Sequence, residues 1–132
     1  MRWTLKQPYE GFFVLEMPET YDVSEIEAAF KEMHDTAVAY PGRNILMVVD
    51  ASRVVSSNIR SRTAIAGCLR KYSHIFGKKV KAQAFVSKRT LVRGAITAIH
   101  WLFRPRYELD VFSTYAEAEQ WLLSKNRRRA TG

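Results

Sequence analysis

The chain contains very little cysteine and no long apolar segment. Only Cys68 of its 132 residues is a cysteine, so no intrachain disulfide can form, which is usual in a reducing compartment. The longest mainly apolar stretch, residues 91–103, is shorter than the roughly 20 residues that cross a bilayer. The N-terminus lacks the apolar core of a signal peptide. We therefore predict a cytoplasmic protein without a membrane span.

Acidic residues are missing from the middle of the chain. Residues 1–50 carry 4 Lys and Arg against 9 Asp and Glu, whereas residues 51–107 carry 13 Lys and Arg and no acid. Residues 108–132 carry 4 of each kind, which completes the net charge of +8. This asymmetry indicates an acidic partner, such as a protein, nucleic acid, phosphate group or anionic membrane surface. The alternative is a solvated basic face that keeps the protein soluble.

Motifs for catalysis, cofactors and metals are absent as well. There is no glycine-rich dinucleotide or phosphate loop, and the three histidines do not have the spacing of metal ligands. Cys68, inside a predicted helix, is typical of a small buried apolar residue. No nucleophile, base and orienting group can be assembled from the sequence. We predict a non-catalytic protein with no cofactor and no metal.

The residues that are present form the pattern of one α/β domain. Short strands are expected at residues 3–5, 12–16, 45–49, 80–86 and 109–112. Helices are expected around residues 26–37, 59–76, 91–103 and 115–123. The run at 45–49 is apolar without alternation, as in a strand that is buried on both faces.

The order of these elements predicts the fold class. Strands that alternate with helices favour right-handed crossovers and a mainly parallel sheet. The two N-terminal strands are joined too closely for a crossover, so we expect them to pair antiparallel at an edge. The predicted order is β-β-α-β-α-β-α-β-α, with five strands and about four helices. Residues 1–124 should form a single domain, followed by a basic, disordered tail at residues 125–132.

Three segments resemble the STAS or SpoIIAA-like family. They are ILMVVDASRVVSSN at residues 45–58, VKAQAFVS at residues 80–87 and YELDVFSTYAEAEQWL at residues 107–122. The most specific part is the pattern F-x-T-x-x-E-A-x-x-W-L, formed by Phe112, Thr114, Glu117, Ala118, Trp121 and Leu122. The resemblance covers residues 42–123 and implies the fold of anti-sigma-factor antagonists and of bacterial STAS/SEC14-like proteins.

In the antagonists, a serine at the start of the second helix is phosphorylated to control partner binding. Ser56 and Ser57 lie near the matching place, although the Asp before and the Gly after the family's serine are missing. The resemblance therefore implies a phospho-switch in this loop. The alternative interpretation of Ser57 is a helix N-cap, which needs only one side-chain hydrogen bond.

Polar residues are expected to gather at the carboxyl ends of the parallel strands, where open α/β sheets bind ligands. Helix N-termini in the same place would direct amide groups toward an anion such as phosphate. The alternative is that these residues only cap helices. The candidates for this phospho-switch or anion site are Asp50, Ser52, Ser56, Ser57, Asn58 and Ser87.

The predicted helix at residues 91–103 is apolar over a wider arc than one side of a sheet requires. Such a helix is either deeply buried, under the N-terminal strands or the tail, or it contributes to an interface or a ligand cavity. We predict a homodimer. The candidate dimer or ligand face consists of Val92, Ile96, Trp101 and Phe103.

The leading functional prediction is a regulatory, protein-interaction module that docks an acidic partner, as the resemblance implies. The predicted basic partner surface consists of Arg53, Arg60, Arg62, Arg70, Lys71, Lys88 and Arg89. One alternative is a small-molecule or lipid carrier, which the SEC14-like branch of the resemblance suggests. Another is non-specific nucleic-acid binding through residues 51–107 and the basic tail, which charge alone supports.

Overall fold

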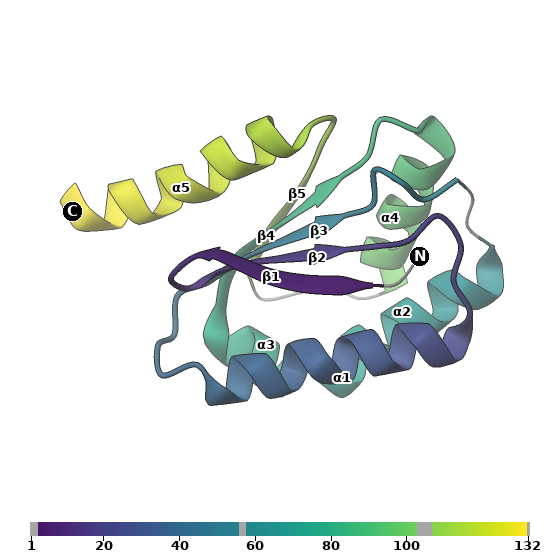
Figure 1. Cartoon of the computed structure of the whole chain (residues 1–132), viewed down its shortest axis with the longest axis horizontal. Helices are drawn as coiled ribbons and strands as arrows, with labels where there is room; N and C mark the ends of the chain where they lie inside the picture. Colours follow the sequence, from purple (N-terminus) through teal and green to yellow (C-terminus); the bar gives the residue numbers. More distant parts are fainter. Residues whose placement is uncertain (1–2, 56–57, 103–106, 132) are drawn as a thin grey trace.

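The computed structural model describes residues 3–55, 58–102 and 107–131. Its strands are β1 (Thr4–Tyr9), β2 (Phe12–Glu16), β3 (Ile45–Asp50), β4 (Val80–Val86) and β5 (Glu108–Phe112). Its helices are α1 (Val23–Ala39), α2 (Ile59–Lys71), α3 (Ser73–Lys79), α4 (Thr90–Leu102) and α5 (Tyr115–Thr131). Figure 1 shows a single sheet, with α1, α2 and α3 on one side and α5 on the other.

The strands lie in the order β1-β2-β3-β4-β5, as Figure 1 shows. β1 pairs antiparallel with β2, and every other neighbouring pair is parallel, so the predicted α/β architecture is confirmed. Gly11 turns the β1–β2 hairpin with a φ of 73°, a conformation that glycine adopts without strain. β2 to β5 end at one edge of the sheet, here called the carboxyl edge, and begin at the opposite amino edge.

The central strands are apolar because they are buried on both faces of the sheet. Ile45–Val49 is fully buried, as its unbroken apolar run predicts. One core cluster joins the sheet to α1, α2 and α3, and a second joins it to α5 through Ala118 and Leu122. A third cluster places α4 against the sheet beside Val49 and Phe85.

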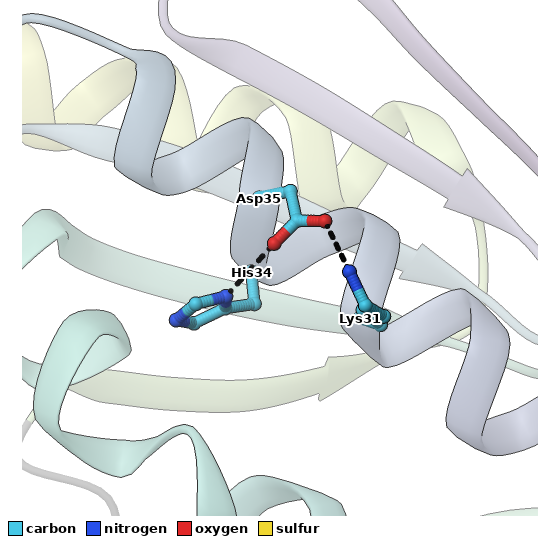
Figure 2. Close-up of polar contacts among 3 residues, drawn as sticks. All are labelled: Lys31, His34 and Asp35. Atoms are coloured by element: carbon cyan, nitrogen blue, oxygen red, sulfur yellow. Dashed lines mark hydrogen bonds and ion pairs between the residues drawn. The ribbon is translucent and has the colours of Figure 1, made fainter.

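The helix expected at residues 59–76 is two helices, because the chain bends at Tyr72. Tyr72 has φ −102° and ψ 10°, outside the helical range, and it separates α2 from α3. Its ring stacks on His34 of α1 at 4.6 Å between centroids. Figure 2 shows His34 beside Asp35, whose carboxylate also accepts a hydrogen bond from Lys31 at 2.9 Å. At this bend the Tyr72 ring thus contacts α1.

The C-terminal helix is longer than the sequence predicts. A disordered tail was expected from Lys125, but α5 continues to Thr131. Lys125 is only 7% exposed, and its ammonium group lies 3.0 Å from Glu108 and 4.6 Å from the Trp121 ring centre. The contact with Glu108 joins α5 to β5, a tertiary interaction that helical periodicity cannot reveal.

Gln83 is the least expected residue of the core. Gln83 is polar, but its side chain is 2% exposed. Its nitrogen contacts the Met47 sulfur at 3.8 Å, and its oxygen has no hydrogen-bond partner. An unpaired buried oxygen of this kind costs about 1–3 kcal/mol of stability.

We expect Gln83→Leu to raise the free energy of unfolding by about 1 kcal/mol, because an unpaired polar group is replaced by an apolar one of similar size. Urea denaturation measures the change. The exposed Gln120 on α5 supplies the control, and Gln120→Leu should change stability by less than about 0.5 kcal/mol. A loss of stability in Gln83→Leu would contradict this account of the core.

Two glycines should respond to alanine in opposite directions. A Cβ at Gly67 in α2 would meet nothing within 4 Å, so Gly67→Ala should stabilise the protein by about 0.5–1 kcal/mol. At Gly11 a Cβ would lie 2.6 Å from the Tyr40 hydroxyl oxygen, and φ is positive. Gly11→Ala should therefore destabilise by about 2 kcal/mol. Thermal and urea unfolding of the two variants distinguish these effects, and equal shifts would contradict the prediction.

Candidate functional site

The carboxyl edge brings several of the predicted polar residues together. Asp50 ends β3, and its carboxylate accepts a hydrogen bond from the Ser52 amide at 3.0 Å. Asn58 caps α2 by accepting one from the Ser61 amide at 2.8 Å. Ser87 is fully buried, and its hydroxyl oxygen accepts one from the Arg89 amide at 3.2 Å. The observed contacts of Asp50, Asn58 and Ser87 are thus those of caps and turns. Ser56 and Ser57 lie outside the described residues.

Arg93, which the sequence analysis did not select as a site residue, connects two loops of this edge. Its guanidinium donates hydrogen bonds to the Ser87 carbonyl at 3.3 Å and to the Ser113 hydroxyl at 3.1 Å. The first contact lies in the loop after β4 and the second in the turn after β5. Arg93 therefore fixes the ends of two neighbouring strands relative to α4.

Apolar side chains are exposed at the same edge. Five large hydrophobic side chains are exposed among the described residues, and three of them follow β3 or β4. They are Val55, Ile59 and Leu91, which are 42%, 74% and 80% exposed. Because α2 and α4 follow neighbouring parallel strands, their first turns lie at the same edge. The sequence analysis did not select these three residues, although Ile59 and Leu91 each directly follow a predicted helix cap.

The predicted basic surface divides into two groups. Arg53, Arg60, Lys88 and Arg89 are exposed at the carboxyl edge, in the loops after β3 and β4 and the first turn of α2. Arg70 and Lys71 are exposed at the other end of α2, and Arg62 is half-buried. At 1.5 Å per residue, Arg60 and Lys71 are about 16 Å apart along the helix axis. The cations next to the exposed apolar residues are therefore those of the first group.

The carboxyl edge also has an acidic side, at the end of β2 and in the loop that follows this strand. Glu16 ends β2 opposite Asp50, and its carboxylate lies 2.8 Å from the Lys6 ammonium group. The hydrogen bond from Lys6, then that from Thr4, holds the pKa of Glu16 below its usual value, and the charge of Arg53 acts in the same direction. The edge thus changes from acidic at β2 to basic at β4.

The described part of the predicted dimer or ligand face is buried. Val92 and Ile96 are 3% and 6% exposed and pack in the core against the sheet, so a second chain cannot reach them while this core stays closed. They line a cavity of about 30 Å³, about the volume of one water molecule and far smaller than the 300–1,000 Å³ of ligand pockets. The side chain of Trp101, and Phe103 as a whole, lie outside the described residues. The homodimer stays a prediction.

The described residues contain no cluster of potential metal ligands, and Cys68 is poorly suited to act as a nucleophile. No group of three or more potential metal ligands occurs among them. Cys68 is buried, and burial raises the pKa of its thiol, which lowers the thiolate fraction that a nucleophile needs. None of the helices in the described ranges is long and apolar enough to cross a membrane.

Comparison with known proteins identifies the family. The model of the SpoIIAA-like family matches residues 12–123, which is most of the chain. The chain belongs to the SpoIIAA-like family. The fold and the resemblance predicted from the sequence are thereby confirmed, and the SpoIIAA-like fold is consistent with a STAS-type module. No curated protein matches the chain.

Two solved structures share this SpoIIAA-like fold. One is an uncharacterised protein of the DUF3478 family from Shewanella loihica PV-4, with a TM-score of 0.65, 13% identity and 91% of each chain covered. The other is the protein TM1081, with a TM-score of 0.58 and 17% identity, covering 89% of this chain and 86% of that one. At these identities the likeness shows the fold alone.

The ion pair at Glu16 predicts a pH effect. Because the folded pKa is lowered, this carboxylate stabilises the protein above its ordinary pKa of 4.5, and that stabilisation is lost as the pH falls through the folded pKa. Lys6→Met should raise the pKa of Glu16 toward 4.5, as measured by NMR titration of the side-chain carboxyl. Lys31→Met is the control, since it should raise the pKa of Asp35 and leave Glu16 unchanged. An unchanged pKa of Glu16 in Lys6→Met would show that Lys6 is not the main cause of the lowered pKa.

Proposed function

We propose that this SpoIIAA-like protein is a non-catalytic regulatory module that docks an acidic protein partner at the carboxyl edge. The supporting observation is the exposure of three apolar side chains among cations. The carboxyl-edge patch consists of Arg53, Val55, Ile59, Arg60, Lys88, Arg89 and Leu91. These residues belong to the segment that contains no acidic side chain.

The exposed apolar residues favour a protein over a bare polyanion as partner. Burial of Ile59 or Leu91 in an interface would contribute about 25 cal/mol for each Å² of apolar surface removed from water. Protein interfaces combine an apolar centre with a polar rim, and arginine is enriched in them. A phosphate backbone would use the cations but would gain nothing from Val55, Ile59 and Leu91.

The carboxylates at this edge have contacts within the protein. Glu16 is held by Lys6 and Thr4, and Asp50 accepts the Ser52 amide. The cations of the patch come from the segments that follow β3 and β4, whereas Glu16 and Glu19 lie on the β2 side. An acidic partner would therefore be attracted to one side of the edge and repelled from the other, which would fix its orientation.

The serine pair gives this docking a means of control. Ser56 and Ser57 lie in the chain between Val55 and the α2 cap Asn58, so a phosphate there would bring about −1.5 to −2 charges next to the patch. The added charge would weaken the attraction for an acidic partner. This switch rests on the family resemblance and on the position of the two serines in the sequence.

Selection of displayed random peptides on the immobilised full chain tests the proposal. Binders should combine Asp or Glu with a large apolar residue. Lys88→Gln with Arg89→Gln should weaken a selected peptide about tenfold, and Leu91→Ser should do so by a similar factor, since burial of a leucine is worth about 1.5–3 kcal/mol.

The control removes two positive charges elsewhere. Arg43→Gln with Lys78→Gln, at the amino edge, leaves the same net charge as the first variant and should weaken the peptide by less than about twofold. Peptides without acidic residues, or equal losses in the two double variants, would show that the carboxyl-edge patch is not the docking site.

A further inference from the structure

A second concentration of positive charge lies at the amino edge, across the sheet from the carboxyl-edge patch. A shallow, open depression of about 600 Å³ is lined there by Arg43, Lys78, Lys81, Glu108 and Lys125, among others. These residues come from five separate segments, namely the loop before β3, then α3, β4, β5 and α5. Sequence analysis did not predict this site, because only the folded sheet brings the segments together.

The single carboxylate of this depression is neutralised from inside the protein. Lys125 is 7% exposed, and its ammonium group lies 3.0 Å from the Glu108 carboxylate and 4.6 Å from the Trp121 ring centre. Within the described ranges, Arg43, Lys78 and Lys81 form no ion pair with any carboxylate. The positive charge of these three side chains therefore remains uncompensated.

The lysines around the depression are partly fixed in position. The Lys81 ammonium group donates a hydrogen bond to the carbonyl oxygen of Lys125 at 3.2 Å. That of the neighbouring Lys79 donates to the carbonyl oxygen of Tyr40, at the C-terminal end of α1. Side chains that are already ordered lose less conformational entropy when a ligand binds. Of the cations that line the depression, Lys81 is thus held in place before a ligand binds.

We propose that the amino-edge depression binds a small ligand that carries two or more phosphate groups. Arg43 can form paired hydrogen bonds with a phosphate, while Lys78 and Lys81 act as point charges. The volume lies within the range of small-ligand sites. The cations surround one depression that several elements form, which favours a compact anion over an extended strand. This inference does not depend on the proposed partner docking at the other edge.

Titration of the full chain with tripolyphosphate tests the site by calorimetry at about 0.15 M salt, where charges about a Debye length apart are screened. The wild-type protein should bind. Arg43→Gln with Lys78→Gln should weaken binding about tenfold, whereas Lys88→Gln with Arg89→Gln should change it by less than twofold. Both double variants alter exposed residues and have the same net charge, so misfolding and overall charge do not explain a difference.

A variant that removes a negative charge instead of positive ones provides a second test of the site. Glu108→Gln removes the depression's carboxylate and leaves the Lys125 ammonium group unpaired, so tripolyphosphate should bind several-fold more tightly. Glu27 is an exposed residue of α1. Glu27→Gln changes the net charge by the same amount as Glu108→Gln and should not tighten the binding of tripolyphosphate. Thermal unfolding in the absence of ligand verifies that each variant is folded.

Two results would overturn the inference. They are no binding of tripolyphosphate to the wild-type protein, whether or not a DNA duplex binds at the amino edge, and equal weakening by the two double variants. The peptide measurements at the carboxyl edge are separate. Loss of peptide docking with intact tripolyphosphate binding would refute only the proposed function, and the reverse result only this inference.

Discussion

Burial of β3 and β4 on both faces is the constraint on which the rest of the structure depends. Ile45–Val49 exposes no residue to solvent, so helices must cover the sheet on both sides. The parallel pairing of β2 to β5 then requires a crossover between each strand and the next, and each crossover contains a helix. As a result, all four strands end at one edge and begin at the other, and the two edges can serve different purposes.

At the carboxyl edge the protein satisfies most of its own polar groups. Asp50, Asn58 and Ser87 each accept a hydrogen bond from a nearby backbone amide, and Arg93 connects the strand ends. What remains for a partner is the apolar surface of Ile59 and Leu91 with the surrounding cations. This division is the reason for proposing a protein-docking surface where the sequence suggested an anion site.

The ion pair of Lys125 and Glu108 has a comparable role at the amino edge. The Lys125 side chain is 7% exposed but that of Glu108 is 60% exposed, and a pair so open to solvent adds little net stability. Its effect here is on the surface field, since it neutralises the carboxylate among Arg43, Lys78 and Lys81. Positive charge therefore lies at both edges of the sheet, with Lys88 and Arg89 at one edge and Arg43, Lys78 and Lys81 at the other.

The sequence by itself determined the element order, the two-sided burial of β3 and the antiparallel hairpin, because hydrophobic periodicity and loop length are local properties. It also identified Asn58 among the candidate caps. Only the tertiary structure decided that the helix after residue 59 bends at Tyr72 to contact His34, that Gln83 is buried with an unpaired oxygen, and that Lys125 belongs to α5. The tertiary structure also decided that Ile59 and Leu91 are exposed, and that Arg43, Lys78 and Lys81 line one depression. Each depends on contacts between segments that are distant in the chain, and no local pattern of residues records which segments those will be.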